Sequence, residues 1–323
     1  MEGTLPPIRP VTPQEIEAAR IRIAGTIFRT PLVKLQLTGE FPDIYLKLEN
    51  LQPINSFKLR GAANAVAMLA PERRSQGVWT ISAGNAGQGV AYAARAAAVP
   101  CTVVTIETAP ETKVARMRAL GARIVKASFD ACWEAMEQRA FPGVDGTFVH
   151  PFDDDDFVAG NATMGLEIVE DLPNVETVIT AIGGGGLVTG VASGVRARKR
   201  NVRVYGAEPE TAAPGALSFA RGQASVFPQW QATFVDGSGG KSVFPRMWER
   251  MRPVVDGSIV VTLDETRSAM RLLAEKARVI AEGAGALSVA AALRSKDLKG
   301  PIVAVVSGGN IDLAKFFELI AAE

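Results

Sequence analysis

Histidine and cysteine are scarce in this 323-residue chain, and their scarcity excludes several kinds of active site. With a single histidine, His150, a His-x-x-x-His zinc site cannot form, and a Ser-His-Asp or Cys-His arrangement would depend on that residue alone. The two cysteines, Cys101 and Cys132, permit neither a paired-cysteine metal site nor a disulfide framework. If the chain is an enzyme, its proton transfers therefore fall to lysine, carboxylates or a bound cofactor.

Net charge is nearly absent as well, because 35 Lys and Arg residues offset 34 Asp and Glu residues and leave +1. This balance predicts no overall attraction to nucleic acid or to an anionic membrane. The sequence has no uninterrupted apolar run of about 18 residues, so no membrane span is expected. The Pro-rich segment 1–12 lacks the apolar core of a signal peptide. We therefore expect a soluble, cytoplasmic protein.

Short β-rich runs alternate with Ala-rich helical stretches, an order typical of α/β proteins with parallel sheets. The expected strands are 43–48, 78–83, 101–106, 122–127, 146–150, 177–182, 203–207, 258–263 and 301–306. The four between residues 78 and 150 predict a compact unit inserted into a larger one. We expect a large domain of residues 1–69 and 153–323 and a small domain of residues 70–152. The four acids at 153–156 are expected to form a solvated loop.

Four consecutive glycines, Gly183 to Gly186, follow the expected strand 177–182 and precede a helix-compatible stretch that opens with Leu187. Backbone N–H groups without side chains, at a helix N-terminus, form a cradle for a phosphate. A tight turn is the alternative, although a turn needs one or two glycines rather than four. The dinucleotide pattern G-x-G-x-x-G fails, and Val235 occupies the glycine position of a P-loop ending at Gly240-Lys241-Ser242. The glycines therefore predict a site for a single terminal phosphate.

Lys58 is a candidate for a reactive amine. It stands between Phe57 and Leu59 at the start of an expected helix, with Ser56 as the expected N-cap. Apolar neighbours and the positive end of a helix disfavour the ammonium form, so a neutral, nucleophilic amine is easier to reach. Because most helix lysines are solvated, this segment alone is a weak indication of catalysis.

Two further segments follow expected strands. The run Ser82-Ala83-Gly84-Asn85-Ala86-Gly87-Gln88-Gly89 exposes backbone N–H groups that suit a carboxylate, and Asn85 adds a neutral amide for a cofactor oxygen. A plain strand–turn–helix corner is the alternative explanation. Near the C-terminus, Ser307-Gly308-Gly309-Asn310 follows the strand 301–306, where α/β folds place ligand groups.

Together these segments resemble the fold-type II (tryptophan synthase β-like) family of pyridoxal-phosphate enzymes, in particular the threonine/serine dehydratase and serine racemase group. The resemblance covers about residues 29–310, beginning with Arg29-Thr30-Pro31-Leu32. It implies two open, twisted, mainly parallel sheets flanked by helices, and pyridoxal 5′-phosphate held covalently by the catalytic residue Lys58. The cofactor-binding residues that it implies are Phe57, Lys58, Asn85, Gly183, Gly184, Gly185, Gly186, Leu187, Glu282 and Ser307. The substrate-binding residues that it implies are Ser82, Ala83, Gly84, Asn85 and Ala86.

The resemblance also implies a reaction, the removal of water and ammonia from a β-hydroxy amino acid such as threonine or serine. Asn85 would contact the pyridine 3′-oxygen and Ser307 the pyridine nitrogen. A neutral serine cannot keep that nitrogen protonated, which favours prompt loss of a β-leaving group. Lys58 would take the Cα proton, the β-hydroxyl would leave, and hydrolysis would give a 2-oxo acid and ammonia. A homodimer is implied by the family only.

Three departures from the family pattern modify these expectations. Ala83 replaces the serine with which racemases protonate Cα from the opposite face, so racemisation should be poor. Ala86 replaces a common histidine and leaves room for a larger substituent, such as the phenyl group of phenylserine. The family's divalent-cation site retains Glu208 and Ala212, but Pro214 replaces its second acid. A stimulating Mg²⁺ or Ca²⁺ is therefore in doubt, because these ions need several oxygen ligands.

Several alternatives remain open on the sequence alone. The substrate can be threonine or serine, the bulkier phenylserine, or the acidic 3-hydroxyaspartate. A racemase is disfavoured by Ala83, and a β-replacement enzyme such as a cysteine synthase by the dehydratase-like Phe57-Lys58-Leu59-Arg60-Gly61. A cofactor-storage or amino-acid-sensing protein on the same scaffold is the non-enzymatic alternative. The chain ends about where the catalytic part of the family ends, so no regulatory domain is expected.

Overall fold

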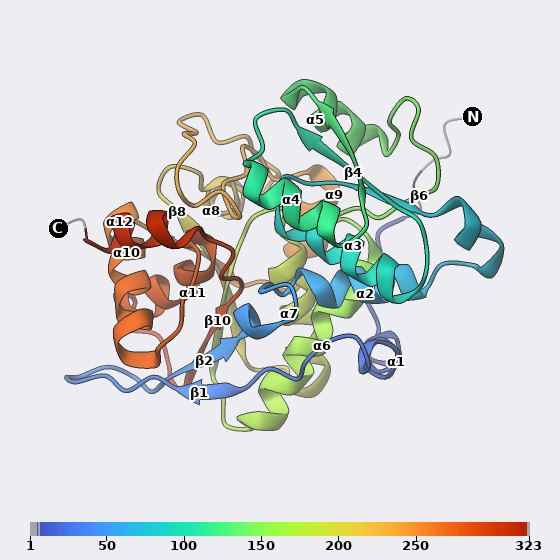
Figure 1. Cartoon of the computed structure of the whole chain (residues 1–323). Helices are drawn as coiled ribbons and strands as arrows, with labels where there is room; N and C mark the ends of the chain where they lie inside the picture. The colour runs from blue at the N-terminus through green and yellow to red at the C-terminus, as the bar shows by residue number, and fades with distance from the viewer. Residues whose placement is uncertain (1–4, 6, 322–323) are drawn as a thin grey trace.

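A computed structural model describes residue 5 and residues 7–321, and its strands form two sheets (Figure 1). The larger sheet has the order β1 (Leu32–Lys34), β2 (Ile44–Leu48), β10 (Ile302–Val306), β7 (Thr177–Ala181), β8 (Arg203–Pro209), β9 (Gly257–Val261). The smaller sheet has the order β5 (Arg123–Ala127), β4 (Cys101–Ile106), β3 (Val78–Ile81), β6 (Thr147–Phe148). Neighbouring strands are parallel except β1 and β2. The expected α/β fold with two mainly parallel sheets is confirmed.

Helices connect and cover these strands. They are α1 (Pro13–Ile23), α2 (Lys58–Ala67), α3 (Asn85–Ala96), α4 (Glu111–Ala119), α5 (Phe129–Gln138), α6 (Asp155–Asp171), α7 (Gly186–Arg198), α8 (Pro214–Arg221), α9 (Pro245–Met251), α10 (Leu263–Leu272), α11 (Gly283–Arg294) and α12 (Leu313–Ala321). Short helical turns occupy Glu49–Leu51 and Pro71–Gln76, and a π-helical turn, Leu273–Ala277, extends α10. Figure 1 shows α3, α4 and α5 around the smaller sheet and α10, α11 and α12 gathered on one side of the larger one.

The larger sheet is buried on both faces, and its central strand β10 shows how. Ile302, Ala304 and Val306 pack in the same apolar cluster as residues of α10, α11 and α12. Val303 and Val305 pack in another cluster with α6, α7 and α9. Because successive side chains of a strand point to opposite faces, a strand covered on both faces is apolar throughout. This is why the uninterrupted run IVAVV is a central strand.

Every expected strand is present, with ends displaced by a few residues, and β1 is an addition. Its three residues, Leu32–Lys34, are too few to give a readable alternation pattern. The strands of the smaller sheet all lie between residues 78 and 148, whereas those of the larger sheet flank them in the sequence. The division at residues 69/70 and 152/153 stays a prediction.

The acidic run 153–156 is not a solvated loop, so that expectation is wrong. Asp153 is 3% exposed and accepts hydrogen bonds from Arg139, Arg246 and Arg250. Asp154 caps α6 by accepting the backbone N–H of Phe157 at 2.8 Å. The acids start a helix and join three arginines, two of them from α9, and a sequence window does not show those distant partners.

Across residue 5 and residues 7–321, no helix is both long enough and apolar enough to span a bilayer.

Candidate active site

Residues from both sheets line one cavity of about 440 Å³ at the carboxyl ends of the parallel strands. Ser82 directly follows β3, Gly183 comes two residues after β7, and Ser307 directly follows β10. Ligands bind at these strand ends in open α/β sheets because the loops there converge. The predicted cofactor and substrate residues that line the cavity are Phe57, Lys58, Ser82, Ala83, Gly84, Asn85, Ala86, Gly183, Gly184, Gly185, Gly186, Leu187, Glu282 and Ser307. The structure therefore brings this whole set together.

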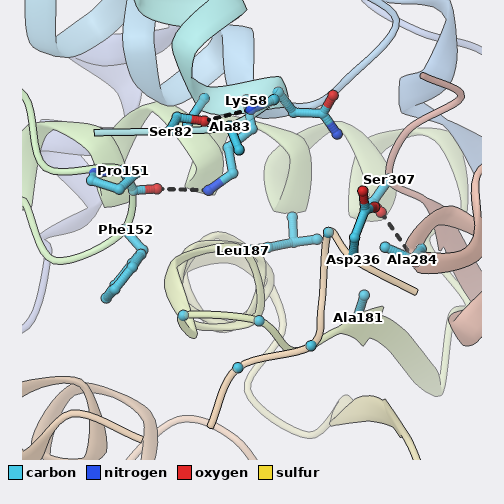
Figure 2. A pocket seen from close by; sticks show the side chains of 18 of the residues that line it. Lys58, Ser82, Ala83, Pro151, Phe152, Ala181, Leu187, Asp236, Ala284 and Ser307 are labelled. Carbon is cyan, nitrogen blue, oxygen red and sulfur yellow. Dashed lines mark hydrogen bonds between the residues drawn. The ribbon is translucent and has the colours of Figure 1, made fainter. Parts of the chain in front are cut away.

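Lys58 is the first residue of α2 and points into the cavity (Figure 2). Its Nζ atom donates to the carbonyl oxygen of Pro151 at 2.7 Å and lies 5.3 Å and 5.5 Å from the ring centres of Phe57 and Phe157. Burial lowers the pKa of the Lys58 ammonium to about 8, because few polar groups replace the lost water. The expected N-cap is displaced by one position: Phe57 occupies it, and Ser56 Oγ accepts the N–H of Lys58 at 3.4 Å.

The helix that carries Lys58 is fixed by a buried ionic cluster around Arg60. The Arg60 side chain is fully buried and donates to both carboxylate oxygens of Glu49 and of Glu167, at 2.7–2.8 Å. Lys47 donates to Glu167 at 2.6 Å and balances the second negative charge. Paired and fully hydrogen-bonded charges are tolerated in a protein interior. The cluster therefore holds the first turn of α2 to β2 and α6.

Three of the four glycines in the loop have a stereochemical explanation. A Cβ atom on Gly184 would lie 2.3 Å from the Phe152 ring, and one on Gly186 would lie 2.9 Å from the Phe152 backbone. Gly185 has φ +89°, which side chains rarely adopt. Close packing therefore requires glycine, in addition to any ligand. In the described part of the chain, the N–H groups of Gly183, Gly184 and Gly185 find no backbone acceptor, and they lie beside the cavity at the start of α7.

The segment Ser82 to Ala86 forms the opposite wall. Ser82 Oγ accepts the N–H of Gly84 at 3.0 Å, so its own O–H group stays available as a donor. Asn85 opens α3, where the first N–H groups have no partner within the helix. Hydroxyl and N–H donors thus converge on the cavity, as a carboxylate requires.

Ser307 and Glu282 form the floor near the larger sheet. Ser307 is 4% exposed, and its hydroxyl makes only a long, 3.4 Å contact with the carbonyl of Ala284 (Figure 2). Glu282 accepts a hydrogen bond from Asn85 at 2.7 Å. Burial, reinforced by the negative charge of Asp236, raises the pKa of the Glu282 carboxyl to about 7. A neutral hydroxyl donor and a partly protonated acid therefore face this side of the cavity.

The candidate cation ligands Glu208 and Ala212 lie outside the cavity lining. Glu208 is buried in β8, and its two oxygens accept the N–H groups of Gly215 and Ala216 in α8 and the hydroxyl of Ser258. Among the described residues, no cluster of three or more His, Cys, Asp or Glu side chains could hold a metal. Mg²⁺ and Ca²⁺ require several oxygen ligands, and a cation at Glu208 and Ala212 stays a doubtful prediction. Burial outweighs these three hydrogen bonds and raises the pKa of the Glu208 carboxyl to about 7.

The single histidine is a structural residue. His150 is 1% exposed, and its Nδ1 atom accepts the backbone N–H groups of Phe152 and Asp153. Its ring packs edge-on against Phe148 and Phe152. Burial, with the positive charge of Arg139, lowers the pKa of His150 to about 3, so the ring is neutral at physiological pH. It holds the turn that presents the Pro151 carbonyl to the lysine.

Part of the cavity wall comes from residues 236, 237, 239 and 240, which were not predicted from the sequence. Asp236 accepts a hydrogen bond from Lys113 of α4 at 2.5 Å, and both residues line the cavity. Lys241 lies 4.6 Å from the ring centres of both Phe129 and Trp230. No local signal marks these residues, because each partner comes from a distant segment.

Comparison with known proteins agrees with this geometry. The sequence profile of pyridoxal-phosphate dependent enzymes matches residues 23–308. The chain belongs to that family. An L-threonine ammonia-lyase of Thermotoga maritima is 40% identical over 308 residues, covering 94% of this chain and 76% of the relative. The structure of the processed form of threonine deaminase isoform 2 from Solanum lycopersicum matches with a TM-score of 0.82 and 30% identity, covering 100% and 98% of the two chains. Maize serine racemase matches with a TM-score of 0.87 and 30% identity, covering 97% and 98%.

This pyridoxal-phosphate dependent enzyme therefore has the expected fold-type II architecture, and its cofactor is pyridoxal phosphate. The cavity fits that group. The open N–H groups of the glycine loop suit a phosphate, the weakly engaged hydroxyl of Ser307 suits a ring nitrogen, and the buried amine of Lys58 would suit covalent attachment.

Proposed function

We propose that this enzyme is an ammonia-lyase that removes water and ammonia from a β-hydroxy amino acid of the threonine or serine type, giving a 2-oxo acid. The observation that supports the proposal is that three features line one cavity. They are a lysine of lowered pKa, a glycine loop with open N–H groups and a neutral serine hydroxyl. The similarity to the threonine ammonia-lyase and threonine deaminase supports the substrate class.

In this proposal the residues of the chain bind, orient and transfer protons. The Ser82 hydroxyl and the free N–H groups at the start of α3 hold the substrate carboxylate, which places Cα beside Lys58. When bound, pyridoxal phosphate supplies the electron sink that stabilises charge on Cα. The amine of Lys58 takes the Cα proton, and its lowered pKa suits that task near neutral pH. The β-hydroxyl leaves together with that proton as water, and a second water molecule hydrolyses the released enamine to the 2-oxo acid and ammonia.

The fold is shared with serine racemases, but Ala83 disfavours that activity here. Racemisation needs a proton donor on the face of Cα opposite the lysine, and an alanine methyl group has no proton to give. Ala83 and Lys58 line the same cavity and are labelled side by side in Figure 2. We therefore expect elimination to exceed racemisation.

One observation favours an acidic substrate as the second candidate. A Cβ atom on Gly84 would lie 3.9 Å from Nζ of Lys113, so this ammonium group lies against the proposed carboxylate loop. The side chain of its partner Asp236 is 56% exposed, so Lys113 can leave Asp236 for another carboxylate. A second substrate carboxylate, as in 3-hydroxyaspartate, could then pair with Lys113.

A substrate panel tests the proposal. Release of 2-oxo acid is measured from threonine, serine, phenylserine and 3-hydroxyaspartate, with the parent enzyme and with Lys58→Ala and Lys113→Met. We expect threonine or serine to give the highest kcat/KM and Lys58→Ala to lose turnover while remaining folded. A preference for 3-hydroxyaspartate that Lys113→Met abolishes would support the second candidate. Preference for phenylserine would instead indicate that the space beside Ala86 accommodates a bulky substituent of the substrate.

A spectroscopic experiment tests the cofactor site directly. Borohydride reduction of the yellow holoenzyme should leave a permanent adduct on the peptide that contains Lys58, identified by mass spectrometry. An adduct on another lysine, or none, would contradict the assignment of Lys58. Full biological function of Lys58→Ala without turnover would favour a cofactor-storage or amino-acid-sensing protein, whereas turnover at the parent rate would show that catalysis does not need Lys58.

We also propose a cytoplasmic homodimer. Cys101 and Cys132 are both free thiols, as in proteins of reducing compartments. Sedimentation of the holoenzyme tests the dimer, and a single species of about one chain mass would contradict it.

A further inference from the structure

We propose that Asn310 and Arg116 are positioning residues that set the orientation of the Asn85 side-chain amide, so that its NH₂ group faces the cavity. This inference rests on the proposed function and on the expectation from the sequence that Asn85 contacts the 3′-oxygen of the cofactor ring. Asn310 is 4% exposed and follows β10, Arg116 belongs to α4, and Asn85 opens α3. The three side chains form one hydrogen-bonded chain that ends at Glu282.

The orientation of the Asn310 amide is determined twice. Arg116 is a pure donor, and its guanidinium lies 2.9 Å from the Asn310 side-chain oxygen, so an acceptor must face it. The carbonyl oxygen of Ile54 is a pure acceptor at 2.8 Å, so a donor must face it. Both constraints place the oxygen of Asn310 toward α4 and its NH₂ group toward Ile54 and Asn85.

Asn310 in turn orients Asn85. Its second N–H group donates to the side-chain oxygen of Asn85 at 2.8 Å, so that oxygen faces Asn310. One N–H of the Asn85 amide donates to Glu282 at 2.7 Å. An amide NH₂ group has two donors, so one remains. Because Asn85 lines the cavity, this donor is the group available to a negatively charged oxygen of the cofactor.

Arg116 is an unusual partner for a neutral amide. Its side chain is exposed, and in the described part of the chain it forms no salt bridge. It reaches from α4, beside the smaller sheet, to the segment that follows the central strand of the larger sheet. The contact therefore makes the orientation of Asn85 depend on how these two parts of the molecule are apposed.

The central experiment compares Asn310→Asp with Asn310→Ala. Aspartate has the shape of asparagine but no donor, so it should draw the Asn85 NH₂ group toward itself and turn the Asn85 oxygen away. Alanine removes the donor without imposing an orientation. Pyridoxal phosphate is titrated into each apoenzyme, and both the dissociation constant and the near-visible absorption band are recorded. We expect roughly 10- to 100-fold weaker binding for Asn310→Asp, with a shifted band, and a smaller loss for Asn310→Ala.

The second comparison tests Arg116 against a matched residue of the same helix. Arg118 is also exposed in α4, but it pairs with Glu111. Arg116→Met should weaken cofactor binding about two- to tenfold and shift the band, because the acceptor of Asn310 loses its partner. Arg118→Met should leave both unchanged, and Arg116→Lys should restore part of the affinity. Circular dichroism of each apoenzyme confirms that the variants are folded.

The outcomes separate this inference from the proposed function. If the parent apoenzyme does not bind pyridoxal phosphate at all, the proposed function fails. If the parent binds but Asn310→Ala is impaired as much as Asn310→Asp, packing rather than donor direction matters and the positioning inference is overturned. Equal affinity and spectra for Arg116→Met and Arg118→Met would overturn the part assigned to Arg116. An Asn310→Asp protein that does not fold leaves the Arg116 pair as the deciding test.

Discussion

Replacing Arg60 by methionine is expected to destabilise the protein by about 3–5 kcal/mol, the usual result of breaking a buried ion pair from one side. Arg60 is fully buried and donates six hydrogen bonds, four of them to the carboxylates of Glu49 and Glu167. Methionine removes this charge from both buried carboxylates, of which Glu167 keeps its ion pair with Lys47. The loss should exceed that of any exposed pair because water cannot replace the missing charge.

The loss should also depend on pH in a defined direction. Burial raises the pKa of Glu49, but the charge and hydrogen bonds of Arg60 outweigh it and leave that pKa lowered. In the parent, the stabilisation by Glu49 is therefore present above its unfolded-state pKa and disappears as the pH falls through the folded one. Without Arg60, burial dominates and raises the pKa, so acid neutralises the stranded carboxyl. The stability difference between parent and variant should shrink from pH 8 to pH 5.

Urea unfolding at several pH values measures both effects. Arg294→Met is the control, because Arg294 pairs with Glu265 at the surface and exposed pairs contribute only about 0–1 kcal/mol. A loss for Arg60→Met no larger than that of the control would refute the reasoning. If the difference in unfolding free energy between parent and variant stays constant or grows toward pH 5, the loss is not caused by unpaired buried carboxylates.

Three further predictions concern the cavity and its surroundings. Gly184→Ala should cost about 1–3 kcal/mol in thermal unfolding, since its methyl group meets the Phe152 ring at 2.3 Å, whereas Gly25→Ala, with nothing within 4 Å, should not. The rate at which the apoenzyme binds pyridoxal phosphate should rise with pH up to about 8 and then level off, because the Lys58 ammonium loses its proton there. A rate measured by stopped flow that does not change with pH would contradict the lowered pKa of Lys58. Chelation by EDTA should leave turnover unchanged, because hydrogen bonds already occupy both Glu208 oxygens; severalfold stimulation by Mg²⁺ would show otherwise.

The strand β10 was predicted for a local reason, whereas the prediction for the acids 153–156 was wrong because their surroundings depend on distant partners. The apolar run of β10 and the glycines after β7 are properties of consecutive residues, so a short window shows them. The acids 153–156 look solvated in the same window, yet arginines of α9 bury the first of them. Glu208 retains the residue type of a cation ligand, but the start of α8 occupies its oxygens.

By itself, the sequence determined the alternation of strands and helices, the order of the site segments and the chemistry that those segments can carry. These follow from side-chain periodicity and from backbone requirements, which act between near neighbours. Only the tertiary structure decided which groups meet. Asn85 and Asn310 are 225 residues apart in the chain, and the donor direction that joins them exists only once both sheets are in place. Such distant partners determine whether a polar atom is already hydrogen-bonded within the protein or is available to a ligand.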